Sequence, residues 1–199
     1  MSVEPESASS TRRALLPQKA MQICAALGLD PQGSPLLRQG MTAEDLLRAL
    51  LENAQYTDAI AMMACALPKR EAVWWACVCA REIDPHPTPV DAAALEAAGR
   101  WVREPNDEHR RAALAAAEAT GYATPGGLAA FGAFLSDGSL APPDCAPVPP
   151  AEHLTARAVS GSVGLAAVLA EPEKAPEKYR LFVERGLDIA HRRLLWDKT

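Results

Sequence analysis

The segment from Ala66 to Glu82, ALPKREAVWWACVCARE, has the densest set of residues that could do chemistry. Three charged side chains flank its apolar middle: Arg70, Glu71 and Arg81. A concave pocket in which charged groups converge is the usual setting of catalysis. One hypothesis is therefore an enzyme whose active site is made of these three residues and lies on helices.

A second hypothesis is a groove for a partner protein. Tryptophan and arginine dominate the energetic centres of protein interfaces, so Arg70 with one indole of this segment could form such a groove. Proline-flanked apolar residues also bind aromatic grooves of other proteins. The candidate contact residues are Arg70, Trp74, Trp75, Trp101, Pro147, Val148, Pro149 and Trp196. The competing interpretation stays open: the tryptophans belong to the core, and the charged residues form structural ion pairs.

The apolar middle of this segment predicts its position in the fold. Nine consecutive apolar residues, Ala72 to Ala80, indicate a helix that is apolar on all sides and central. Lys69 and Arg70 precede them at the expected helix N-terminus, where positive charge opposes the helix dipole. We therefore expect both side chains to have specific carboxylate partners.

The pattern of cysteines and histidines predicts neither a metal nor a cofactor. Cys77 and Cys79 are two residues apart, so on a helix they point about 200° away from each other and cannot share a metal ion. The four histidines are best interpreted as ordinary polar residues: His86, His109, His153 and His191. No metalloprotease, serine hydrolase or nucleotide-binding motif occurs in the sequence.

The composition favours helices and excludes two kinds of partner. Of 199 residues, 49% are hydrophobic and only 5% aromatic, and alanine, the best helix former, dominates the apolar set. The net charge of −5, without a basic stripe, argues against a nucleic-acid partner. No segment is apolar enough to span a membrane as a helix. The acidic balance would also suit a third function, in which this protein binds and neutralises a toxin, but no specific residue points to that function.

The expected compartment is the cytoplasm. Five cysteines without paired spacing fit a reducing environment better than a disulfide framework. The pair Arg12 and Arg13 superficially resembles a twin-arginine export signal. The stretch after it should then be an uninterrupted apolar region, whereas Pro17, Gln18 and Lys19 break it up.

Proline, glycine and capping residues predict an all-α irregular bundle of eight or nine short helices. Residues 1–13 are interpreted as a flexible leader and 14–199 as a single helical domain. Five prolines in residues 141–150 predict an extended strap. A helical hairpin over 153–195 is expected to pack on the body, because it carries too much apolar surface to stand alone. The helices are expected at about 17–27, 42–51, 56–67, 68–82, 89–103, 104–120, 124–135, 153–170 and 176–195.

The chain from about residue 14 to residue 196 resembles a family of bacterial proteins of unknown function. The resemblance is carried by ALPKREAVWWACVCAR at Ala66–Arg81 with Trp101, Pro105 and Arg110, then by GSLAPP at Gly138–Pro143 and LDIA at Leu187–Ala190. Members look helical and are often encoded near type VI secretion components. The resemblance implies a non-enzymatic adaptor or chaperone whose partner is a secretion component or effector. It names no catalytic residue.

Overall fold

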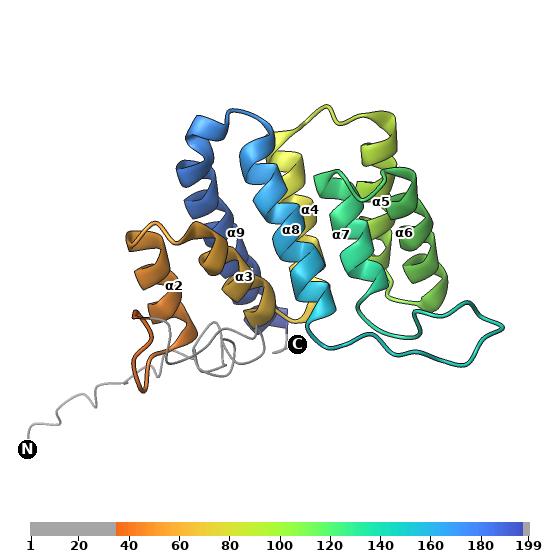
Figure 1. Ribbon diagram of the computed structural model, residues 1–199, viewed down its shortest axis with the longest axis horizontal. Coiled ribbons are helices and arrows are strands. Elements are labelled where there is room, and N and C mark those ends of the chain that lie inside the picture. The colour runs from red at the N-terminus through yellow and green to blue at the C-terminus, as the bar shows by residue number, and fades with distance from the viewer. Residues whose placement is uncertain (1–34, 197–199) are drawn as a thin grey trace, which may run out of the picture.

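The computed structural model describes residues 35–196, with side chains up to Arg192. This part of the chain forms eight α-helices and no β-sheet, which confirms the predicted all-α bundle (Figure 1). The predicted leader, the Arg12–Arg13 pair and the helix expected at 17–27 lie outside the described residues. The α-helices are α2 (Ala43–Glu52), α3 (Tyr56–Ala66), α4 (Lys69–Ile83), α5 (Pro89–Arg103), α6 (Asp107–Ala119), α7 (Pro125–Phe134), α8 (Leu154–Leu169) and α9 (Ala175–Trp196).

The helices begin where capping side chains satisfy the first backbone N–H groups. Thr42 forms the predicted capping box of α2: its hydroxyl accepts from the Asp45 N–H at 3.1 Å, and the Asp45 carboxylate accepts from the Thr42 N–H at 3.2 Å. Thr88 caps α5 and Thr124 caps α7, and each is followed by a proline in the first helical turn. These local signals explain why the predicted bounds of α5 agree with the structure.

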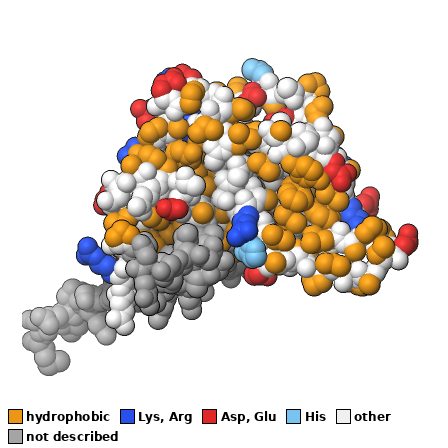
Figure 2. Space-filling model, viewed as in Figure 1, with side chains coloured by type: hydrophobic (Ala, Val, Ile, Leu, Met, Phe, Trp, Pro, Cys, Tyr) orange, Lys and Arg blue, Asp and Glu red, His pale blue; other side chains and the backbone are white. Residues whose placement is uncertain are grey.

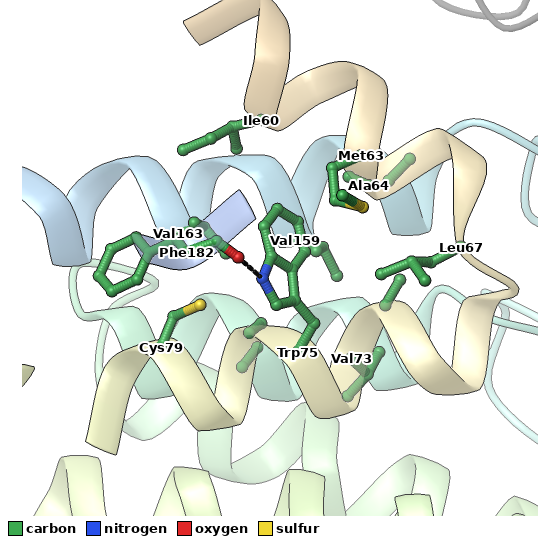
Figure 3. Close-up of a cluster of buried hydrophobic side chains, with 14 of the residues drawn as sticks. Ile60, Met63, Ala64, Leu67, Val73, Trp75, Cys79, Val159, Val163 and Phe182 are labelled. Carbon is green, nitrogen blue, oxygen red and sulfur yellow. Dashed lines mark hydrogen bonds between the residues drawn. The ribbon is translucent and has the colours of Figure 1, made fainter. Parts of the chain in front are cut away.

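Helix α4 lies at the centre of the packing, as its run of apolar residues predicts. It contacts α5, α7, α8 and α9. Trp75 is completely buried, and its indole N–H donates to the Phe182 carbonyl oxygen of α9 at 2.7 Å. Figure 3 shows this ring among side chains of α3 and α8, including Met63 and Val159. The hydrogen bond satisfies the polar atom of an otherwise apolar side chain, as burial of an indole requires.

Helix α7 packs closely on two neighbours because glycines face them. A Cβ atom at Gly132 would lie 3.2 Å from Cγ2 of Val159 on α8. A Cβ atom at Gly126 would lie 2.8 Å from the Asp91 carbonyl oxygen of α5. Any larger residue at Gly126 would therefore push α7 away from α5.

A buried arginine holds the chain where α7 ends. Arg110 of α6 is 2% exposed, and its guanidinium donates to the Phe134 carbonyl oxygen at 2.9 Å and to the Ser139 carbonyl oxygen at 3.1 Å. Asp107 accepts two further hydrogen bonds from the same group. The charge is therefore paired as well as buried, which is the condition under which a buried cation is tolerated.

The proline-rich strap, residues 141–150, leaves the body and returns to it. It turns at its outer end, where the Cys145 N–H donates to the Pro142 carbonyl oxygen at 3.1 Å. The Leu140 N–H then donates to the Val148 carbonyl oxygen at 2.8 Å, which brings the two ends together. Figure 1 shows the strap as a wide loop between α7 and α8. It is extended, as predicted, except at that turn.

The last two helices cover the other side of the core. Helix α8 packs against α3, α4 and α7, and α9 packs against α3, α4 and α8. The short 3₁₀ helix Pro172–Lys174 joins them. Figure 2 shows one face of this arrangement, on which hydrophobic side chains are frequent over α7 and the strap.

Candidate functional site

A pocket of about 400 Å³ lies between α4 and α5. Its α4 wall comes from residues three or four positions apart, which share one face of a helix. Its α5 wall has the same spacing. The lining residues are Arg70, Glu71, Trp74, Cys77 and Arg81 of α4 and Gly99, Val102 and Arg103 of α5. The three charged residues of the enzyme hypothesis therefore lie in one pocket, together with Trp74.

Arg70 closes one end of this pocket. Its Nε donates to the Val102 carbonyl oxygen at 2.6 Å, and its Nη2 donates to the Arg103 carbonyl oxygen at 3.2 Å. These carbonyl groups belong to the last turn of α5, where no intrahelical N–H is available and where the helix dipole favours a cation. Arg70 thus bonds to backbone oxygens, and the carboxylate partner expected for it was wrong.

Two further guanidinium groups meet over Gly99. A Cβ atom built on Gly99 would lie 3.5 Å from Nη2 of Arg81 and 3.6 Å from Nη1 of Arg103. Both cations therefore approach the same point of α5. The missing side chain at Gly99 leaves the space between them open.

The hydrogen bonds of these two cations hold them at the rim of the pocket. Arg81 donates to the Leu95 carbonyl oxygen at 3.4 Å, a long contact, and Arg103 pairs with Glu96 at 2.7 Å. Both side chains of that ion pair are more than half exposed, so the pair contributes little and exchanges readily. The guanidinium groups therefore keep donors that an incoming anion can use.

The charge of the pocket is opposite to that of the chain. Three arginines line it against one carboxylate, Glu71, whereas the whole chain carries −5. No ion pair joins Glu71 to Arg70 or Arg81 within the described residues. The interpretation of these three residues as structural ion pairs was therefore wrong, and the pocket favours an anionic group.

The pocket also has an apolar part, formed by Trp74, Cys77 and Val102. Trp74 is half-buried there. Cys77 is almost completely buried, and burial raises the pKa of its thiol to about 12. The thiol therefore stays protonated at neutral pH and is not a nucleophile. The pocket can hold an anion that is joined to an apolar body.

The other candidate contact residues lie away from this pocket. Trp75 and Trp101 are buried in the core, so their rings contact the protein's own side chains. Val148 is 51% exposed on the strap with its flanking prolines, and none of the three lines the pocket. The side chain of Trp196 lies outside the described residues.

Sequence reasoning missed the α5 wall of the pocket. Gly99, Val102 and Arg103 share one face of α5, and that spacing is visible in the sequence. The sequence does not indicate that this face packs against Arg70, Glu71 and Arg81 of α4, because a loop separates the two segments. The face of α5 could be identified from the sequence, but the helix that it contacts could not.

Two other kinds of site have no candidate in residues 35–196. No group of three or more histidine, cysteine, aspartate or glutamate residues in this range could hold a metal ion. None of its helices combines the length and the apolar character that crossing a membrane requires.

Comparison with known proteins gives the family. No curated protein and no solved structure matches the chain. The model of a family of unknown function (DUF6931) matches residues 46–190, a range that contains the pocket between α4 and α5 and the helices that build it. Because this match covers well over half of the sequence, the chain belongs to the family of unknown function DUF6931.

Proposed function

We propose that the protein is a non-enzymatic adaptor or chaperone that binds an acidic segment of another protein in the pocket between α4 and α5. One observation carries the proposal: Arg70, Arg81 and Arg103 line one pocket together with the half-buried Trp74. Arginine and tryptophan are the residues most enriched where binding energy concentrates.

The size and chemistry of the pocket suit a short acidic contact. A volume of about 400 Å³ holds one or two side chains. The exposed arginines offer paired N–H donors in the planar geometry that a carboxylate accepts. The apolar part of the lining suits a hydrophobic residue next to that carboxylate. An Asp or Glu side chain with an apolar neighbour, or an apolar C-terminal residue, meets both requirements.

Two further parts of the proposal concern the partner and the compartment. The family resemblance supports a type VI secretion component or effector as the source of the acidic segment. The cysteine content supports the cytoplasm as the place of binding. Neither part is needed for the pocket to bind an acidic segment.

Photo-crosslinking in the native bacterium tests the proposal directly. A photoreactive phenylalanine analogue replaces Val102, which lines the pocket, or Val90, which is 46% exposed at the other end of the same helix. We expect the probe at Val102 to capture one protein through a peptide that contains Asp or Glu, and the probe at Val90 not to. Arg81→Gln combined with Arg103→Gln should abolish the capture. Equal capture at both positions, or capture through peptides without acidic residues, would contradict the proposal.

A second candidate function is an enzyme, favoured by one observation. Glu71 lies among the three arginines without an ion pair to Arg70 or Arg81 in the described residues. A carboxylate in that position could take a proton from a bound anionic substrate. Glu71→Gln separates the two functions: it should leave the capture of a protein partner intact or strengthen it, whereas it should stop an acid–base reaction.

A further inference from the structure

A second pocket, of about 430 Å³, lies on the other side of the start of α4. Apolar residues at the end of α3 and the start of α8 form its walls, and its polar lining consists of Lys69, Glu152, His153 and Thr155. It shares no lining residue with the pocket between α4 and α5. It is therefore a separate site, and ligand binding there does not depend on the proposed function.

The hydroxyl of Thr155 in this pocket lacks a hydrogen-bond partner. Thr155 is 1% exposed, and among the described residues its Oγ1 is the buried side-chain oxygen or nitrogen atom without a partner. A buried hydroxyl without a partner costs free energy, so proteins rarely retain one without a use for it. Thr155 is one of the residues that line the pocket.

The first turn of α8 adds backbone donors to this hydroxyl. The N-cap residue, His153, makes no capping hydrogen bond with its side chain. The Leu154 N–H donates to the Ala151 carbonyl oxygen and the Arg157 N–H to the His153 carbonyl oxygen. No acceptor for the N–H groups between them, of Thr155 and Ala156, occurs in the described residues. Two N–H groups at the positive end of a 16-residue helix thus lack acceptors, and both belong to residues that line the pocket.

Basic side chains complete the donor set. Nζ of Lys69 donates to the Ser136 carbonyl oxygen at 3.0 Å and to the Glu152 carboxylate at 3.1 Å. His153 lines the same pocket. On the face shown in Figure 2, a lysine or arginine side chain lies beside a histidine near the end where α8 begins.

The carboxylate of Glu152 already pairs with Lys69, but it is held only weakly. Its side chain is 91% exposed, and its ion pair with Lys69 is the one contact that holds its carboxylate in the described residues. An ion pair this exposed contributes little, so a better anion can displace it. Glu152 therefore competes for the site that a ligand would occupy.

We propose that this pocket binds the phosphoryl group of a small phosphorylated molecule. Residues that line the pocket carry three kinds of donor: two backbone N–H groups, the Thr155 hydroxyl and the Lys69 ammonium group. A tetrahedral phosphoryl group has three terminal oxygens for them, whereas a planar carboxylate has two. The apolar walls leave room for an organic part of the molecule, within the volume usual for small-ligand pockets.

Calorimetric titration of the full chain tests the proposal, with inorganic phosphate as the probe at constant ionic strength. Because phosphate could also bind the arginine pocket, every titration is done in the Arg81→Gln variant. We expect saturable binding of phosphate that exceeds the binding of acetate. Thr155→Val should weaken it about tenfold or more, since a hydrogen bond to a charged group is lost. Glu152→Gln should strengthen it about threefold by removing the competing carboxylate.

Matched controls separate binding from folding. Thr57 is exposed and is the second residue of α3, as Thr155 is of α8, so Thr57→Val should leave phosphate affinity unchanged. Thr155→Val keeps the shape of the side chain and removes the unpaired hydroxyl, so it should melt at a higher temperature than the parent. Weaker binding by a more stable variant cannot result from unfolding.

Two results would overturn the proposal. One is phosphate affinity that is absent, or that neither Thr155→Val nor Glu152→Gln changes; an ordered water would then be the partner of Thr155. The other concerns the source of the phosphoryl group. Glycerol phosphate should bind at least as tightly as a phosphothreonine peptide, and the opposite order would assign the pocket to phosphorylated proteins.

Discussion

Lys69 and Arg70 are consecutive residues at the start of α4, yet they line different pockets. Lys69 reaches toward α8 and pairs with Glu152, as expected for a cation in that position. Arg70 reaches toward α5 and bonds to its last carbonyl groups. Consecutive residues on a helix point about 100° apart, so one turn can serve two separate surfaces.

Because the two side chains line different pockets, substitutions of these neighbouring residues should weaken different binding activities. Arg70→Met should lower the free energy of unfolding by about 1–3 kcal/mol, because carbonyl groups that accepted from a charged donor lose it, and it should weaken capture at the α4–α5 pocket. Lys69→Met should weaken phosphate binding and leave that capture intact. Chemical denaturation, crosslinking at Val102 and calorimetry together check the pair. Parallel loss of both binding activities in either variant would contradict the separation of the pockets.

The two adjacent tryptophans should respond differently to truncation. Trp75 is completely buried and bonded to the Phe182 carbonyl oxygen, so Trp75→Ala should cost about 3–5 kcal/mol of stability. Trp74 is half-buried at the pocket, so Trp74→Ala should cost less and abolish partner capture in a folded protein. Urea denaturation followed by circular dichroism measures both costs. Equal destabilisation would show that Trp74 is also a core residue.

The sequence predicts the helices well because their ends are local events. Thr88 with Pro89, and Thr124 with Pro125, decide where α5 and α7 begin through contacts within one turn. The central position of α4 follows from its apolar composition. That same property hides which tryptophan faces the core: when every side of a helix is apolar, periodicity cannot distinguish Trp74 from Trp75.

The sites depend on contacts that no local pattern contains. Arg81 and Arg103 meet because α4 and α5 pack with Gly99 between them. Thr155 looks like any threonine in a first helical turn, and only tertiary packing makes its hydroxyl buried and unpaired. The sequence therefore identifies charged residues as candidates for a binding site, but it does not identify the residues that they contact.

The cysteines should react with thiol reagents at rates that depend on their burial. Burial raises the pKa of Cys65 to about 11 and that of Cys77 to about 12, so almost none of either is thiolate at pH 8. Cys145 is exposed on the strap. A thiol-reactive disulfide reagent should label Cys145 within minutes and Cys65, Cys77 and Cys79 far more slowly, as measured by mass spectrometry at timed intervals. In denaturant all five cysteines of the chain should react. Equal rates for Cys65 and Cys145 in the folded protein would refute the assignment.

Acid should weaken the arginine contact at the start of α6. Hydrogen bonds from Arg110, and then from Arg111, lower the pKa of Asp107 below its ordinary value of 3.8. A carboxyl group whose pKa falls on folding stabilises the protein at pH values above its ordinary pKa, and this contribution disappears as the pH falls through the lowered value. Asp107→Asn should therefore reduce stability at pH 7, and the difference from the native protein should shrink below about pH 4.

Thermal melting between pH 7 and pH 3 measures that difference. Asp144 is exposed on the strap, so Asp144→Asn should melt like the native protein throughout this range. A difference for Asp107→Asn that stays constant down to pH 3 would mean that the carboxylate charge does not contribute.

Gly99 offers a way to close the arginine pocket without removing a charge. A Cβ atom at Gly99 makes ordinary contacts of 3.5 and 3.6 Å with the guanidinium groups of Arg81 and Arg103, so Gly99→Ala should fit. It should raise the free energy of unfolding by about 0.5–1 kcal/mol, since alanine loses less backbone entropy in a helix than glycine. Gly164→Ala, with no atom within 4 Å of its Cβ, should gain the same amount in α8.

Gly99→Leu then tests whether the space itself matters. Its side chain would extend between the two guanidinium groups that an acidic segment is proposed to bind, so capture through Val102 should be lost while all three arginines remain. Gly164→Leu, with the same change at an open position of α8, should retain the capture. Because charge is unchanged in both variants, a loss confined to Gly99→Leu identifies the pocket as the binding surface. Undiminished capture by Gly99→Leu would show that the partner binds the arginines from outside and does not enter the pocket.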